Sequence, residues 1–257
     1  MKTLFFKSTL SRKKIKIIRL EETGSTNNYL IEMSNEGNLA EGSVVVTDNQ
    51  RQGRGQSGNS WESEAGANLT FSIIFYPVAV KVAEQFVLSK AISLAVYDFL
   101  SKYVPDVSVK WPNDVYVGDR KITGILIENF ISGEYLNKSV AGIGVNINQE
   151  HFISDAPNPV SLRQLTGKIY PLDNCLLSLL THITNRYQMI TNDRNKLDTD
   201  YLEHLYLRGK ESRFNANGVF FDATITGVNK YGMIEMTTKN GECKSFGFKE
   251  VKLVISD

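Results

Sequence analysis

The segment Val44-Val-Val-Thr-Asp-Asn-Gln-Arg-Gln-Gly-Arg-Gly-Gln-Ser-Gly-Asn-Ser-Trp61 says more about the fold than any other stretch of the chain. An apolar strand runs into a loop that carries Gly53, Gly55 and Gly58, with Arg54 between the first two. Glycines at this density let a backbone take positive φ and approach a ligand closely, so that its N–H groups can donate to an anion. The segment therefore predicts a ligand-binding loop.

The spacing of these three glycines also matches the dinucleotide-binding fingerprint. That fingerprint requires a helix directly after the glycines and an acidic residue about 20 positions further on. The glycines are followed instead by a polar stretch, Asn59–Asn68, and by the strand-like segment Leu69–Phe75. The positions about 20 residues on, Tyr76–Val80, hold no carboxylate. The context therefore excludes a dinucleotide-binding fold.

Four further segments carry more specific patterns. They are Gly24-Ser-Thr-Asn-Asn-Tyr29, Val109-Lys-Trp-Pro-Asn-Asp114, Asp119-Arg-Lys-Ile-Thr-Gly-Ile-Leu126 and Ala141-Gly-Ile-Gly-Val-Asn-Ile-Asn148. In this order, and together with the glycine loop, they closely resemble the biotin protein ligases over roughly Ile17 to Asn148. The resemblance implies an α+β fold: a mixed β-sheet flanked by helices, like that of class II synthetases and biotin/lipoate ligases, with a small C-terminal SH3-like β-barrel.

The composition is that of an ordinary globular protein, with 257 residues, 42% hydrophobic and 22% charged. A net charge of +1 gives no electrostatic footprint for nucleic acid, so we expect no such partner. Cys175 and Cys243 lie far apart and outside any CxxC pattern, which indicates neither a disulfide framework nor a zinc site. The sequence shows no signal peptide and no run of 18 apolar residues, so we expect a cytoplasmic protein without a membrane partner.

Hydrophobic periodicity and turn residues divide the chain into two parts. In the first part we expect a helix from Asn27, strands at Val44–Val46, Leu69–Tyr76, Val107–Trp111 and Val140–Ile147, a hairpin of Val115–Val117 with Ile122–Ile127, and helices at Val82–Tyr103 and Leu172–Ile190, the last continuing toward Leu207. In the second part, Asn-Gly turns separate short strands expected at Phe214–Val219, Phe221–Val228, Met233–Thr238 and Lys244–Val254. This pattern predicts a catalytic domain of residues 1–208 and a barrel of residues 209–257.

Biotin ligation, the activity that the resemblance implies, requires charge stabilisation rather than a protein nucleophile. The biotin carboxylate attacks the α-phosphate of ATP, which gives biotinyl-5'-AMP and pyrophosphate. A lysine of a biotin carboxyl-carrier protein or domain then displaces AMP. The enzyme must hold two anions in line and exclude water from a labile anhydride. ATP and Mg²⁺ are thus the implied cofactors and the carrier the implied partner; a homodimer is left open.

Lys121 and Arg54 are the candidate catalytic residues. The resemblance places Lys121 beside the biotin carboxylate and the α-phosphate, where a compact ammonium suits charge that moves between oxygens. It places Arg54 where it helps to bind biotin and orders the loop over the intermediate. Lys110 is a second candidate cation, for which a structural role is equally expected.

The candidate biotin-binding set combines one amide, two hydroxyls and several glycines. A ureido ring offers one acceptor and two donors, which a primary amide and hydroxyls match. The hydroxyl residues are also expected to cap the helix that follows them. The set is Ser25, Thr26, Gln50, Gly53, Arg54, Gly55, Gly124, Gly142 and Gly144.

The candidate ATP-binding set follows the later motifs. It comprises Lys121, Asn113, Asp114, Asn146 and Trp61. Asp114 is also the candidate Mg²⁺ ligand, directly or through water, since Mg²⁺ keeps several waters and needs few carboxylates. The alternative for an Asn-Asp pair after Pro112 is a simple turn. For Trp61, as for Trp111, packing is the first expectation of a large aromatic side chain.

Two features depart from the family pattern. Gln56 and Asn59 stand where many members carry loop arginines, so either the adenylate is held less firmly or other cations substitute. About 20 residues precede Gly24, too few for a winged helix-turn-helix of roughly 60 residues, so we expect no repressor function.

Two alternative functions compete with biotin ligation. A lipoate or octanoate ligase would share the related fold but would not need Gln50 with its hydroxyl partners. A non-catalytic biotin sensor could lose phosphate-handling groups, whereas Lys121, Arg54 and Asn113 are all present.

Overall fold

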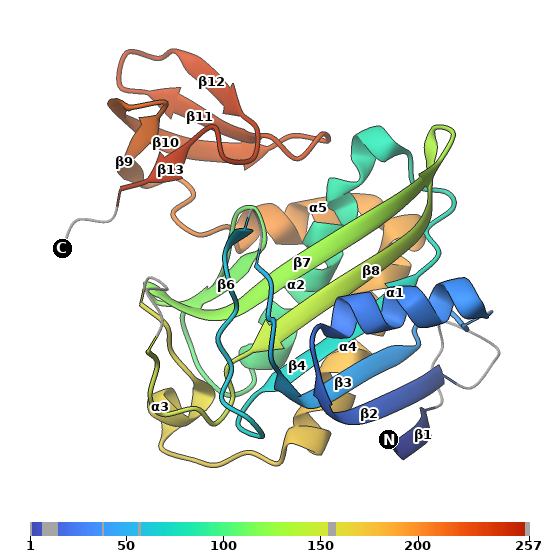
Figure 1. Cartoon of the computed structure of the whole chain (residues 1–257). Coiled ribbons are helices and arrows are strands. Elements are labelled where there is room, and N and C mark those ends of the chain that lie inside the picture. Colours follow the sequence, from blue (N-terminus) through green and yellow to red (C-terminus); the bar gives the residue numbers. More distant parts are fainter. Residues whose placement is uncertain (1, 7–14, 38, 56–57, 154–157, 255–257) are drawn as a thin grey trace.

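An eight-stranded mixed sheet forms the larger part of the molecule, which a computed structural model describes over residues 2–6, 15–37, 39–55, 58–153 and 158–254 (Figure 1). The strand order is β1-β2-β3-β4-β8-β7-β6-β5. Neighbouring strands are antiparallel except β2 and β3, which are parallel, so the predicted mixed sheet is confirmed. The strands are β1 (Lys2–Phe6), β2 (Ile15–Thr23), β3 (Val44–Gln50), β4 (Leu69–Phe75), β5 (Val107–Lys110), β6 (Asp114–Val117), β7 (Arg120–Ser132) and β8 (Tyr135–Val145).

Helices cover both faces of this sheet, which explains why every residue of β4 is buried. On one face, α1 (Thr26–Glu36) covers a cluster that includes Ile74 and Val140. On the other face, α2 (Phe86–Leu100) and α4 (Leu172–Asn192) pack over a cluster that includes Phe71. Two short helices, η2 (Val82–Glu84) and α3 (Leu162–Thr166), lie in connections, and α5 (Arg194–Glu203) follows α4.

Several predicted elements are confirmed and others need correction. The expected helix at Val82–Tyr103 is wrong in its bounds, because it divides into η2 and α2. The expected continuation of the long helix is interrupted at Asp193, whose backbone leaves the helical region and whose side chain caps α5 by accepting from the Lys196 N–H. The expected hairpin is present, with Gly118 at a φ of 57°.

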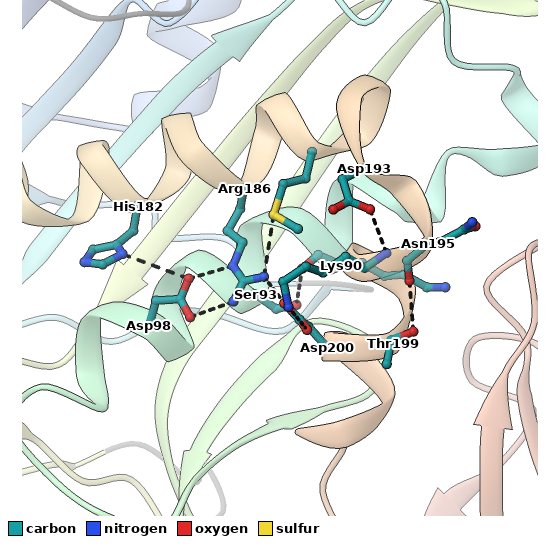
Figure 2. Close-up of polar contacts among 11 residues, drawn as sticks. Lys90, Ser93, Asp98, His182, Arg186, Asp193, Asn195, Thr199 and Asp200 are labelled. Carbon is teal, nitrogen blue, oxygen red and sulfur yellow. Dashed lines mark hydrogen bonds and ion pairs between the residues drawn. The ribbon is translucent and has the colours of Figure 1, made fainter.

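Charged side chains tie α2, α4 and α5 together (Figure 2). Arg186 of α4 contacts both oxygens of Asp98 on α2, at 2.6 and 2.8 Å, and one oxygen of Asp200 on α5 at 2.5 Å. Burial alone would raise the pKa of Asp200, but hydrogen bonds from Arg186 and Lys196 keep it below its ordinary value. The network fixes α5 against the helices behind the sheet.

A second, antiparallel sheet of five strands follows α5, in the order β12-β11-β10-β9-β13. Its strands are β9 (Glu211–Ala216), β10 (Val219–Val228), β11 (Ile234–Thr238), β12 (Cys243–Phe246) and β13 (Lys252–Leu253). Asn217 and Gly218 both have positive φ, 52° and 87°, as the type I′ turn of a two-residue hairpin loop requires. The single strand expected at Lys244–Val254 is wrong, since two strands occupy it. The small antiparallel sheet is consistent with the expected SH3-like unit.

The two sheets share a hydrophobic cluster. Leu88 of α2 and Tyr201 of α5 lie in the same cluster as Phe214, Ile225 and Met236 of the second sheet. The proposed domain boundary at residues 208 and 209 therefore lies beside a continuous core, and it stays a prediction. None of the described helices is long and apolar enough to cross a membrane.

Candidate active site

A cavity of about 770 Å³ lies between the large sheet and the second sheet. It gathers most of the predicted residues: Ser25, Thr26, Gln50, Arg54, Gly55, Trp61, Asn113, Asp114, Lys121, Gly124, Gly142 and Gly144. Gly53 and Asn146 are predicted residues that do not line it. The second sheet and its loops supply the opposite wall, with Phe214, Met236, Phe248, Lys249 and Lys252 among others.

One end of the cavity is built from a side-chain amide and hydroxyls. Ser25 is the N-cap of α1, so the predicted capping role is present. The Thr26 backbone N–H and hydroxyl approach Gln50 Oε1 at 2.9 and 3.2 Å. The hydroxyl oxygens of Ser72 and Thr26 lie 2.7 Å apart and share a hydrogen bond. These contacts fix the orientation of the Gln50 side-chain amide at the end of β3.

The glycines of β7 and β8 make room for side chains of the protein itself. A Cβ on Gly144 would lie 2.3 Å from the Trp61 ring, and one on Gly124 would lie 2.8 Å from it. A Cβ on Gly142 would lie 2.5 Å from Asn27 Oδ1. The indole of Trp61 therefore lies directly over the two strands, as expected of a packing residue. Its Nε1 is buried and has no hydrogen-bond partner within the part of the chain that the structure describes.

Two lysines and one carboxylate meet at the other end of the cavity. Lys121 Nζ lies 2.8 Å from Asp114 Oδ1, and both side chains are about four-fifths buried, with 22% and 18% exposed. Lys110 donates to the Tyr116 hydroxyl at 2.8 Å. Burial lowers the pKa of Lys110; Asp114 opposes this and Lys121 reinforces it. The cluster can accept an anion beside Lys121.

The backbone on either side of Lys121 is held by the segment that leads into α3. The Lys121 N–H donates to the Asn158 carbonyl, and the Lys121 carbonyl accepts from Val160, both at 2.9 Å. Asn113 lies in the turn that joins β5 to β6, as the alternative for this pair expected, and Asp114 is the first residue of β6. The Asn113 side chain also donates to the Ile125 carbonyl of β7 at 2.5 Å, so the turn is attached to the neighbouring strand. These hydrogen bonds hold the backbone of Lys121 beside β6.

The metal prediction rests on Asp114 alone. No group of three or more His, Cys, Asp or Glu side chains that could hold a metal ion occurs among the described residues. A single carboxylate is compatible with Mg²⁺, which binds through one or two carboxylates together with substrate phosphates and water.

The glycine loop folds back on itself and is tied to α1. Gly55 donates to the Asn59 carbonyl at 2.6 Å, and Trp61 donates to the Gly53 carbonyl at 2.9 Å. Arg54 donates to Asn28 Oδ1 at 2.5 Å and lies 3.4 Å from the Glu128 carboxylate. Gln56, one of the departures from the family pattern, lies outside the described residues.

Asn146 is buried below the cavity instead of lining it. Its Nδ2 donates to the Val160 carbonyl at 3.1 Å, while its Oδ1 has no partner among the residues described. Sequence reasoning missed Asn27, although it stands within a recognised motif, and missed the lysines of the second sheet, which stand in none.

The chain is similar to known biotin ligases in both sequence and fold. The model of the biotin/lipoate A/B protein ligase family matches residues 20–146. The biotin--[acetyl-CoA-carboxylase] ligase of Mycobacterium tuberculosis is 31% identical over 202 residues, which cover 77% of this chain and 73% of that protein. The bifunctional ligase/repressor BirA of Bacillus spizizenii is 26% identical over 88% of this chain and 70% of its own length. The biotin protein ligase of Aquifex aeolicus, solved with biotin and ATP, superposes with a TM-score of 0.78 at 27% identity, over 93% of this chain and 99% of that one.

Proposed function

The chain belongs to the biotin/lipoate A/B protein ligase family, and we propose that it is a biotin protein ligase. It activates biotin with ATP to give biotinyl-5'-AMP and pyrophosphate, and it transfers the biotinyl group to a lysine of a biotin carboxyl-carrier protein or domain. The observation that carries this proposal is one cavity with an amide and hydroxyls at one end and a lysine–carboxylate cluster at the other.

The amide and hydroxyl end suits the ureido ring of biotin. Gln50, Thr26 and Ser25 offer donors and acceptors to a group that has one carbonyl and two N–H groups. The tail of biotin then extends along the cavity past Trp61, whose indole covers Gly124 and Gly144, and brings its carboxylate toward Lys121. A lipoyl ring has no hydrogen-bonding groups of this kind, so it would leave the amide and hydroxyls unpaired.

The lysine cluster suits the α-phosphate of ATP. Lys121 neutralises the carboxylate and the phosphate as they approach, and it stabilises the charge that moves to the bridging oxygen. Arg54 and the glycine loop close over the adenylate and exclude water. Mg²⁺, held by Asp114 directly or through water, would neutralise charge on the phosphates.

In the transfer step, the amine of the carrier lysine attacks the acyl carbon of the adenylate. The bond between the acyl carbon and the phosphate oxygen breaks, and AMP leaves with the electron pair. The amine must lose its proton, for which the departing AMP phosphate and solvent at the open mouth are available. No side chain of the protein needs to form a covalent bond.

Pyrophosphate release and carrier labelling test the proposal together. With biotin, ATP and Mg²⁺, the protein should release pyrophosphate and label one lysine of a biotin carboxyl-carrier domain. Lipoate in place of biotin should give negligible turnover, because the polar end of the cavity discriminates against it. Efficient lipoylation would overturn the assignment, and binding of biotin without pyrophosphate release would favour a sensor.

A further inference from the structure

The carboxylate of Glu128 on β7 joins two parts of the site that are far apart in the sequence. Its Oε2 accepts a hydrogen bond from Asn27 Nδ2 at 2.7 Å. Both of its oxygens lie 3.4 Å from Arg54 Nη2. Glu128 itself does not line the cavity, whereas Asn27 and Arg54 do. Glu128 therefore reaches the cavity only through the residues that it contacts.

Asn27 has little freedom to turn. It is only 4% exposed, its Oδ1 accepts from the Ser72 hydroxyl at 2.5 Å, and it lies against the bare backbone of Gly142. The amide N–H₂ group must therefore be satisfied by Glu128 and by the Leu126 carbonyl, 3.4 Å away. A buried donor that loses its acceptor carries the full cost of desolvation.

Arg54 is held more loosely. Its side chain is 46% exposed, so the ion pair with Glu128 is weak by itself. The same Nη2 also donates to Asn28 Oδ1 at 2.5 Å, so two elements hold the guanidinium at the cavity mouth. The carboxylate thus links a rigid amide of α1 to the arginine at the start of the glycine loop.

We propose that Glu128 is a positioning residue that orients Asn27 in the cavity wall and holds Arg54 against α1. The inference rests on the proposed function and adds to it the group that links Asn27 in the cavity wall to Arg54 at the cavity mouth. The two contacts of Glu128 can be tested separately, because only one of them needs a negative charge. An amide at position 128 can still accept a hydrogen bond from Asn27, but it cannot form an ion pair with Arg54.

Two variants of the full-length protein test this separation. For Glu128→Gln we expect the Kd for biotin to stay within about twofold, while preformed biotinyl-5'-AMP leaves the enzyme roughly two- to fivefold faster, in line with a lost exposed ion pair. For Glu128→Ala we expect the same faster release and, in addition, a roughly tenfold rise in the Kd for biotin, because the Asn27 donor is left unsatisfied. Calorimetric titration and a rapid-filtration release assay measure the two quantities, and thermal unfolding shows that each variant is folded.

Glu22→Gln is the matched control. Glu22 lies 3.3 Å from Arg51 and accepts from Asn49 at 2.9 Å, so it also pairs with an exposed arginine next to the same loop and with an asparagine. Neither Glu22 nor Arg51 lines the cavity. We expect this variant to match wild type in both measurements.

A double-variant experiment asks whether Arg54 transmits the effect. In an Arg54→Ala background, Glu128→Gln should accelerate adenylate release no further. Three results would each overturn the inference. Glu128→Gln could accelerate release equally in both backgrounds, Glu128→Gln could release the adenylate as slowly as wild type, or Glu22→Gln could accelerate release as much as Glu128→Gln. If wild type neither binds biotin nor releases pyrophosphate, the proposed function itself fails, and the inference with it. Unchanged Glu128 variants of an active enzyme refute only the inference.

Discussion

The glycines on β7 and β8 show how single residues shape the cavity. Gly124 and Gly144 lie on neighbouring strands and pair directly across them, so their missing side chains leave one continuous flat surface. The indole of Trp61 occupies that surface, so the two glycines make room for a side chain of the protein itself. A side chain at either position would have to displace the indole before it could obstruct biotin.

A Gly144→Ala variant should therefore move Trp61. The added Cβ would lie 2.3 Å from one indole carbon and 2.4 Å from Nε1, and overpacking of this kind costs about 1–3 kcal/mol. We expect a lower melting temperature, weaker biotin binding and a shifted tryptophan emission spectrum. Gly37→Ala is the control, because an added Cβ there meets nothing within 4 Å. Equal biotin affinity and emission in the two variants would contradict the role given to Trp61.

Lys121→Ala should damage adenylate formation far more than biotin binding. The loss of one preorganised charged donor costs about 10²–10³ in rate, whereas biotin is recognised mainly through neutral groups. Lys121→Arg should recover only part of the rate, because a planar guanidinium does not replace a compact ammonium that lies 2.8 Å from Asp114. Pyrophosphate exchange beside biotin titration measures both effects. Near-normal exchange by the alanine variant would shift the role to Arg54 or Lys110.

At the scale of elements, the ion-pair network around Arg186 holds α5 in place. It thereby also positions the segment that follows α5 in the chain. That segment runs beside β5, where the Val109 N–H donates to the His204 carbonyl and Tyr206 donates to the Val109 carbonyl. Tyr206 lines the cavity and donates to Asp119 at 2.7 Å. Helix packing on the far face of the sheet therefore places one wall of the cavity.

Arg186→Met should be strongly destabilising. It would leave Asp98 and Asp200, with side chains 24% and 11% exposed, without their shared partner. Breaking such a pair typically costs about 3–5 kcal/mol. Arg163→Met, which breaks the more exposed pair with Glu150, should cost at most about 1 kcal/mol. Chemical denaturation of both variants measures the difference, and equal losses would show that the network contributes little.

The accuracy of prediction from the sequence followed the strength of the local signal. The β3 and β4 strands and the Gly118 and Asn217-Gly218 turns have clear patterns, and the structure contains all of them. The break between α4 and α5 was missed because apolar residues continue on both sides of Asp193, and only its capping geometry marks the end. The strands β1 and β2 were not predicted. Lys249, Lys252 and Glu128 could not be predicted either, because folding alone brings them to the site from outside every motif.

At the scale of the whole molecule, the cavity needs both sheets. Its amide end and its lysine cluster come from the large sheet and α1, while the second sheet supplies the opposite wall. Trp111 links the two, since its Nε1 donates to the Gly232 carbonyl at 2.8 Å and its ring packs against Phe248. The motif that follows β5 thus contributes to the contact between the sheets as well as to the site.

The two sheets should unfold in one transition, because Leu88, Tyr201, Phe214 and Ile225 belong to one buried cluster. The chain has two tryptophans, so Trp61→Phe leaves Trp111 as a single fluorescent reporter of the contact between the sheets. In that variant, melting followed by Trp111 fluorescence and by far-ultraviolet circular dichroism should give the same midpoint. Replacing Trp111 by Phe in wild type, which keeps an aromatic ring but removes the donor to Gly232, should lower stability by about 1 kcal/mol without splitting the transition. A fluorescence midpoint clearly below that of the helical signal would mean that the second sheet detaches first. It would then behave as a separate domain beyond residue 208, and the shared cluster would contribute less to stability than its burial indicates.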